Sequence, residues 1–268
     1  MKTKKKTRPI SSDELDALAN SRMEGVRKEP YALTPPKGWG ELTDEQLRYV
    51  FTMLTMGKSV EEVATYCLVR FTGMEVESRY SERYWLIRHG KETFMVDTLN
   101  MADCIEDMMW IGEAPDMPVR ISEVDGHKAV DSQLHGITFG DYIRLENYYQ
   151  GYLMSHDDRA VDAMVAILYP GLDTSHLDPC IRYGTVLWMV SVKKLFARLF
   201  PDFLRPASPN ADGTPPDMRA VMVAEIRALT GGDVTKNAAV LESDAWDALT
   251  ELNEKAREAR EFNEKMKK

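Results

Sequence analysis

The chain has 268 residues, 44% of them hydrophobic and 29% charged, which is enough apolar content for a folded core and excludes a disordered protein. Its net charge of −9 disfavours a general nucleic-acid coat, and its three cysteines, none in a CxxC pair, exclude a disulfide framework and a thiolate zinc cluster. No apolar run has the length of a membrane span, and no apolar segment follows the N-terminal lysines as a signal peptide requires.

Residues 1–40 have the composition of a flexible N-terminal arm. The segment is basic at its start and rich in proline and glycine near its end. Such a composition disfavours regular secondary structure. We expect a short helix at residues 13–20, with the remaining residues lying along another surface or mobile.

Residues 41–136 are predicted to form a helical hairpin followed by β-hairpins. Thr43 is a good N-cap with Gln46 three residues later, and Ser59 and Glu62 repeat this pattern at the next helix. Because only a few residues connect the two helices, they are expected to pack antiparallel.

Two β-hairpins are expected next, at about residues 84–96 and 119–130. The first consists of two β-prone runs around a short loop with a glycine. The second contains Asp125-Gly126, a pair that suits a type I′ turn because both central residues need a positive φ. A helix is predicted between the two hairpins, with methionines at helical spacing.

Residues 137–268 are predicted to form a helical domain with a proline-rich loop at 205–216. The segment 183–200 is apolar on nearly all faces, so we expect it to be the central buried helix, with Trp188, Met189 and Leu195 in the core. The predicted fold class is therefore mainly α within α+β: a helical bundle with two short β-hairpins in its N-terminal half.

The candidate catalytic residues form no recognised constellation. The five histidines lack HExxH spacing, so a zincin is excluded. The best metal-like cluster consists of His156, Asp157, Asp158 and Asp162, which we interpret as a helix N-terminus with acids placed against the helix dipole. The alternative is a small metal-dependent hydrolase that uses the acids near His156. We predict no catalytic residue, no bound metal and no cofactor.

A second alternative is a DNA-associated protein. Residues 58–69 resemble the opening of a helix-turn-helix, and the N-terminal lysines add positive charge. The turn glycine is missing, however, and Glu75 and Glu77 stand where a recognition helix should be basic. We therefore expect no specific nucleic-acid binding.

Two places are candidate partner contacts. Met108, Met109 and Trp110 are interpreted mainly as core residues, but the same cluster suits an adaptable surface for an apolar partner. The last helix, from about Ser243, has an apolar stripe that fades after Ala259, so Phe262 is the last large apolar residue. It is expected to contact a partner helix or a second copy of the chain; the alternative is a solvated helix end.

Two pairs of segments carry a resemblance to a known class. They are ITFGDYI at 137–143 with AILYP at 166–170, and LTGGDVTK at 229–236 with WDALTELN at 246–253. Together they resemble proteins of bacteriophage and prophage tail modules, of the kind encoded beside the tape-measure gene, some of which are thought to be tail-assembly chaperones. The resemblance covers mainly the C-terminal half and carries over no catalytic residue.

The resemblance implies a function in phage tail assembly, or as a tail accessory protein, through protein–protein contacts. The expected partners are tail proteins such as a tape-measure protein, whose apolar helices a chaperone would shield, and a second copy of the chain. No membrane association is expected. The expected location is the cytoplasm of the bacterial host or the virion.

Overall fold

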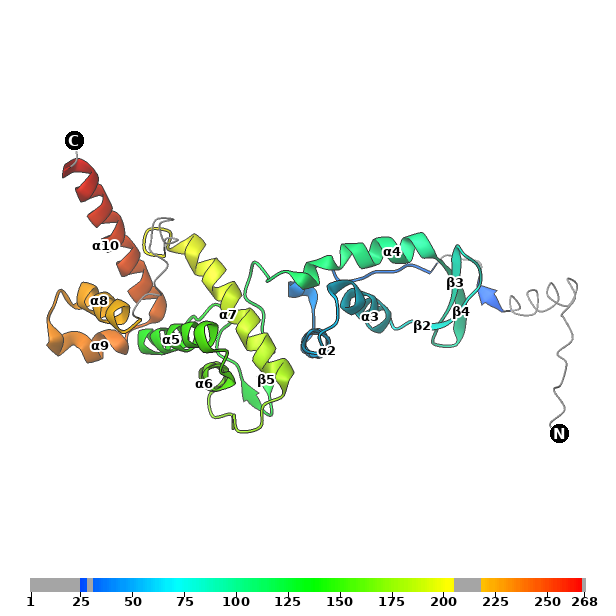
Figure 1. Cartoon of the computed structure of the whole chain (residues 1–268), viewed down its shortest axis with the longest axis horizontal. Coiled ribbons are helices and arrows are strands. Elements are labelled where there is room, and N and C mark those ends of the chain that lie inside the picture. Colours follow the sequence, from blue (N-terminus) through cyan, green and yellow to red (C-terminus); the bar gives the residue numbers. More distant parts are fainter. Residues whose placement is uncertain (1–24, 28–30, 205–217, 267–268) are drawn as a thin grey trace, which may run out of the picture. The chain divides into compact units, whose positions relative to one another are not determined.

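The computed structural model describes residues 25–27, 31–204 and 218–266 (Figure 1). The chain divides into two compact units, each built from two separate stretches: residues 1–37 with 60–110, and residues 38–59 with 111–268. This division differs from the predicted segments 1–40, 41–136 and 137–268. The predicted fold class is confirmed, because the structure is mainly helical with two small sheets. The helix expected at 13–20 and the loop expected at 205–216 lie outside the described residues.

The first unit combines a sheet with two helices. Its elements are β1 (Val26–Arg27), α3 (Val60–Thr72), β2 (Glu75–Arg79), β3 (Tyr84–His89), β4 (Glu92–Asp97) and α4 (Thr98–Asp107). A 3₁₀ turn, η2 (Met109–Gly112), follows at the boundary between the two units. Helix α3 packs on α4, and α4 also contacts β4.

The sheet has the strand order β1-β4-β3-β2. The predicted first hairpin is confirmed: β3 and β4 pair antiparallel, with Ile87 opposite Phe94, around a glycine at φ 63°. Strands β2 and β1 were not predicted, because β2 is polar on both faces and β1 has only two residues. Part of the predicted arm is therefore a strand that pairs parallel with β4.

The extended segment after β1 is fastened to this unit by Tyr31. Its hydroxyl donates a hydrogen bond of 2.9 Å to the carbonyl of Thr72, and its ring lies 5.0 Å from that of Phe94. Residues 31–37 thus lie along the folded unit, which is the first of the two arrangements expected for the arm.

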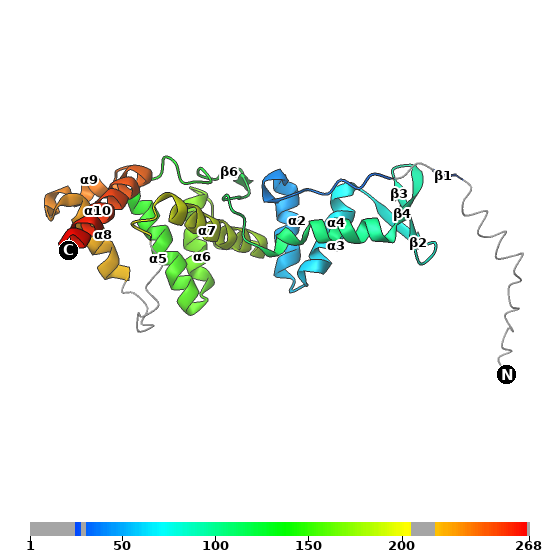
Figure 2. The same ribbon diagram turned by 90° about the horizontal axis from the view of Figure 1, so that it is seen from above.

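The second unit is mainly helical (Figure 2). Its helices are α2 (Asp44–Thr55), α5 (Phe139–Ser155), α6 (Asp158–Leu168), α7 (Pro179–Leu199), α8 (Met218–Thr230), α9 (Asn237–Leu241) and α10 (Ala245–Met266). Its shorter elements are the 3₁₀ turns η1 (Trp39–Glu41) and η3 (Val234–Lys236) and the strands β5 (Glu123–Val124) and β6 (His127–Lys128).

The capping box predicted for α2 is confirmed. The backbone N–H of Gln46 donates to the hydroxyl of Thr43 at 3.3 Å, and the backbone N–H of Thr43 donates to the side chain of Gln46 at 2.9 Å. The packing partner of α2 differs from the predicted helical hairpin. Helix α2 packs on α7 in the second unit, whereas α3 packs on α4 in the first.

The predicted central helix is confirmed as α7. Trp188 and Met189 are fully buried and Leu195 is nearly so. The indole N–H of Trp188 donates a hydrogen bond of 2.8 Å to the carbonyl of Ser132, so this large side chain is buried without leaving a polar group unpaired. Helices α2 and α6 pack on α7, and α5 packs on α6.

The second predicted hairpin is present but its strands are only two residues long. Asp125 and Gly126 have φ values of 48° and 82°, both positive as the predicted turn requires. The hairpin ends early because the following chain pairs elsewhere: the N–H of Val130 donates to the carbonyl of Leu168, at the end of α6, at 2.8 Å.

A close approach of α2 and α7 gives the first testable prediction. A Cβ added at Gly184 would lie 2.6 Å from the fully buried ring of Phe51, which has little room to move. We expect Gly184→Ala to destabilise the second unit by about 1–3 kcal/mol, the usual cost of overpacking a core, measured by urea unfolding.

Two further variants make this prediction specific. Gly151→Ala, also within a helix but with nothing within 4 Å of the added Cβ, should be neutral or stabilising by up to about 1 kcal/mol. Phe51→Leu should recover part of the loss when combined with Gly184→Ala. A Gly184→Ala protein as stable as the natural chain would contradict the packing described.

Candidate partner-binding surfaces

The motif segment 137–143 meets the residues just before the segment 246–253, at the beginnings of α5 and α10. Thr138 and Asp244 form an isolated β-bridge, with hydrogen bonds of 2.8 Å from the N–H of Phe139 to the carbonyl of Ser243 and 3.0 Å from the N–H of Ala245 to that of Ile137. Segments more than a hundred residues apart in the sequence are therefore joined by their backbones.

The first turns of α10 are anchored to their own unit. The carboxylate of Asp244 accepts a hydrogen bond of 2.8 Å from the N–H of Trp246, which caps the helix. The indole of Trp246 stacks on His135 at 4.2 Å and donates to the carbonyl of Gln133 at 2.9 Å. Ala245, Ala248, Leu249 and Leu252 are buried.

The remainder of α10 has few contacts with its own unit. No residue of the helix is buried between 253 and 266, the last described position. An ion pair of 2.6 Å joins Arg260 to Asp202, and Lys255 pairs with Glu251, one turn earlier on the helix, at 2.9 Å. The side chains of Phe262 and Met266 are 64% and 73% exposed. In Figure 1 these last turns extend away from α8 and α9.

The second predicted contact cluster contains both buried and exposed residues. Met108, the C-cap residue of α4, is fully buried, so it is not available to a partner and its interpretation as a core residue fits. Met109 is 41% exposed and Trp110 is half-buried. Phe262 belongs to the other compact unit.

Helix α8 is a candidate surface that sequence reasoning missed. Its half-buried face carries Met222, Ile226 and Leu229, yet Val221 and Val223 are exposed on its other side, at 36% and 54%. A helix that is apolar on all sides is normally covered on all sides. The signal was present in the sequence, since residues 218–230 contain only three charged side chains.

The acids near His156 have structural roles. His156 ends α5 in the left-handed region at φ 52°, and Asp157 caps α6 by accepting from the N–H of Arg159 at 2.9 Å. The guanidinium and backbone N–H of Arg159 lower the pKa of Asp157 below its ordinary value. Asp162 forms a two-point ion pair with Arg182 at 2.6 and 3.1 Å.

Within residues 25–27, 31–204 and 218–266, no three histidine, cysteine or acidic side chains gather where a metal ion could be held. The residues near His156 are thus engaged in capping and ion pairing, as the first interpretation of this cluster expected. The hydrolase alternative has no donor set in this part of the chain.

The resemblance to a helix-turn-helix does not extend into the structure. Helix α3 ends at Thr72, and the chain then forms β2 (Glu75–Arg79) at the edge of the sheet. A recognition helix is required at this position for insertion into the major groove. A strand carrying two glutamates cannot serve that purpose.

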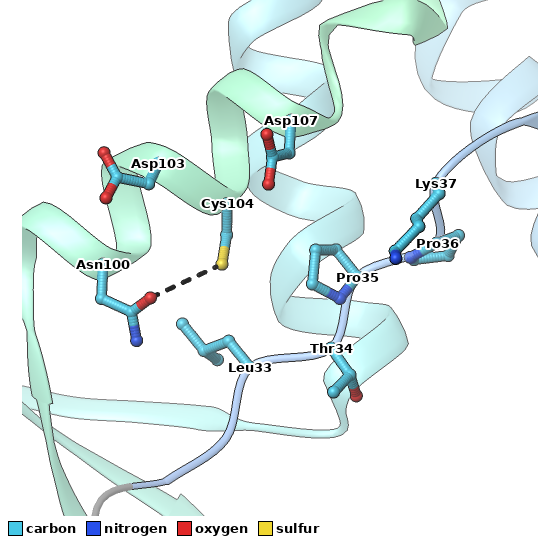
Figure 3. Close-up of a pocket in the computed structure, with 9 residues that line it drawn as sticks. All are labelled: Leu33, Thr34, Pro35, Pro36, Lys37, Asn100, Asp103, Cys104 and Asp107. Carbon is cyan, nitrogen blue, oxygen red and sulfur yellow. Dashed lines mark hydrogen bonds between the residues drawn. The ribbon is translucent and has the colours of Figure 1, made fainter.

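A cleft of about 560 Å³ lies in the first unit between α4 and the extended segment. It is lined by Leu33, Thr34, Pro35, Pro36, Lys37, Asn100, Asp103, Cys104 and Asp107. Figure 3 shows Cys104 directed towards Leu33 and Pro35, with Asp103 at the margin. Its mixed lining of prolines, an amide and carboxylates suits polar or cationic groups.

The thiol in this cleft is not activated as a nucleophile. Burial, with smaller contributions from Asp107 and Asp103, raises the pKa of Cys104. Burial likewise raises the pKa of Cys67 to about 12 and that of Cys180 to about 11. A nucleophilic cysteine needs a lowered pKa, so these three thiols are neutral packing groups near pH 7.

Comparisons of the chain with protein-family models, with curated proteins and with solved structures gave no match. Among the described helices, none combines the length and the apolar character needed to cross a membrane. The local geometry of these surfaces therefore carries the functional argument.

The state of Cys104 can be checked by alkylation. At pH 8, iodoacetamide should modify Cys104 in the folded protein at least about tenfold more slowly than in urea, because the native thiol is buried and protonated. Peptide mass spectrometry after timed quenching measures both rates. Equal rates in native buffer and in urea would show that the thiol is accessible and ionised.

Proposed function

We propose that the protein is a phage tail assembly or tail-accessory protein that acts through protein–protein contacts, in the bacterial cytoplasm or in the virion. The observation that carries the proposal is the end of α10, where Phe262 and Met266 are largely exposed on a helix whose base is firmly anchored. Exposed large apolar side chains on a rigid support are typical of contact sites for other chains.

The chemistry of this surface favours a helical partner. Two apolar side chains at i and i+4 form one stripe on a helix, and such a stripe fits against the apolar face of a second helix. The flanking residues alternate in charge, with Glu258 and Glu261 among arginines and lysines. A partner is therefore selected by its apolar stripe more than by its net charge.

A tape-measure protein matches this requirement. The resemblance of residues 137–143 and 246–253 to tail-module proteins favours such a partner over an unrelated helix. Before a tail tube forms, the long apolar helices of a tape-measure protein need shielding from one another. A chain with an anchored helix that carries exposed apolar side chains at its end supplies that shielding. A second copy of the chain, bound through the same helix, would compete with the tape-measure protein for this surface.

The proposal predicts that serine at both Phe262 and Met266 weakens binding to a co-expressed helical tape-measure fragment by at least about tenfold, since central apolar contacts typically contribute 1–2 kcal/mol each. The thermal midpoint should change little, because exposed side chains contribute within about 0.5 kcal/mol to stability. Binding is measured by pull-down and titration calorimetry, and self-association by sedimentation.

The matched control is Val234→Ser, which removes an apolar side chain that is 75% exposed elsewhere in the same unit. It should leave binding unchanged. Point variants are preferable to deleting residues 258–268, because the deletion also removes the ion pair between Arg260 and Asp202. Unaltered fragment binding and unaltered self-association in the double variant would refute the role of this surface.

A further inference from the structure

A partly buried cluster of ionisable side chains lies where α5, α7 and α8 approach one another. The ammonium of Lys193 on α7 contacts Oε1 of Glu146 on α5 at 2.5 Å, and the amide of Gln150 donates to the same oxygen at 2.9 Å. The second oxygen of Glu146, Oε2, is buried and finds no hydrogen-bond partner among the residues that the structure describes. A buried carboxylate oxygen without a donor is costly.

Helix α8 adds a second carboxyl group to this cluster. Glu225 is the only acidic residue of α8 and lies on its half-buried face between Met222 and Ile226. The amide of Asn147, next to Glu146 on α5, contacts the sulfur of Met222 at 4.0 Å, which places this face of α8 against α5. Glu146 and Lys193 both act electrostatically on the carboxyl group of Glu225, so the field of one ammonium group is shared by two carboxyl groups.

The surroundings of Glu225 make its charged form unfavourable. Burial and the neighbouring Glu146 raise its pKa to about 7, and Lys193 only partly offsets them. The phenol of Tyr142 on α5 responds to the same charges: its pKa is raised by burial, then by Glu146 and Glu225. Among the described residues, Glu146 and Lys193 are the charged groups that act most strongly on Glu225.

We propose that Glu146, Lys193 and Glu225 form a proton-dependent latch that holds α8 against α5, and that loss of one proton near neutral pH loosens α8. With the proton present, the cluster contains one negative and one positive charge, and Glu225 has a carboxyl O–H that can donate a hydrogen bond. Without it, two carboxylates compete for Lys193. Loosening of α8 exposes its apolar face at Met222, Ile226 and Leu229.

The direction of the pH dependence follows from proton linkage. Glu225 binds its proton with a pKa of about 7 in the docked helix, against an ordinary value of 4.5. The docked state therefore binds more protons between these two values. Docking is strongest below pH 4.5, weakens as the pH rises towards 7, and changes little above that. Between pH 6 and pH 8 the docking constant should fall about tenfold.

The test is hydrogen exchange of the full chain at pH 6 and pH 8, corrected for the intrinsic exchange rate. Protection of the α8 amides should fall about tenfold in the natural protein, whereas α7 amides keep theirs. Glu225→Gln removes the titrating group and should abolish the fall in α8. Glu146→Gln leaves the burial of Glu225 in place and removes only the second cause of its raised pKa, so it should reduce the fall. Glu258→Gln, on an exposed turn of α10, should retain it.

The carboxyl carbon of Glu225, followed by NMR, gives a second and independent readout. A midpoint near 7 supports the latch, and a midpoint near 4.5 overturns it. Equal α8 protection at both pH values in the natural protein overturns it as well, as does a tenfold fall that persists in Glu225→Gln. These outcomes are separate from partner binding by Phe262, so the latch and the proposed function stand or fall independently.

Discussion

The burial of α7 is the constraint on which the second unit depends. Trp188, Met189 and Val192 are fully buried, and two helices from earlier in the sequence, α2 and α6, pack on α7. Helix α2, which lies more than a hundred residues earlier, reaches α7 because Gly184 lets the ring of Phe51 approach the backbone. A side chain at position 184 would hold the two helices apart. This close contact, together with the hydrogen bonds from Ser122 to Asp44 and from Arg48 to the carbonyl of Glu123, joins α2 to the later part of the unit.

The contact between α2 and α7 also shows which features the sequence could predict and which it could not. The capping box at Thr43, the positive φ values at Asp125-Gly126 and the uniformly apolar segment of α7 are local patterns, and each is present in the structure. The pairing of α2 with α7 is not local. A short connection between two helices favoured a hairpin, but the apolar faces of α2 and α3 are buried in different units.

The sheet shows the same distinction. The β3–β4 hairpin has alternating apolar residues and a glycine turn, so its pattern is visible in the sequence. Strand β2 gains its hydrogen bonds from β3 while its own side chains remain mostly exposed, and therefore it carries no apolar pattern. An edge strand of this kind is defined by its neighbour's backbone, which a linear reading of residues does not contain.

The candidate contact residues also differ in burial in a way that the sequence does not reveal. Helical spacing alone does not distinguish a methionine that fills a core, as Met108 does, from one that meets solvent, as Met109 does. The exposed position of Phe262 was predictable because the apolar stripe of α10 fades before it. The apolar character of α8 was equally visible, but its significance depends on how few of its side chains the unit covers.

Helix α8 and the end of α10 together suggest why a mainly helical chain would tolerate exposed apolar surface. Unpaired apolar faces promote aggregation, so a protein that needs them must keep them rigid or keep them covered. The base of α10 supplies rigidity through Trp246, whose indole is fixed by both stacking and a hydrogen bond. The cluster at Glu146 keeps the apolar face of α8 covered by holding this helix against α5, and the strength of that hold depends on a single proton. An apolar core residue in place of Glu225 would hold α8 more firmly, so the retained carboxyl group is more consistent with a helix that must be able to move than with one selected only for stability.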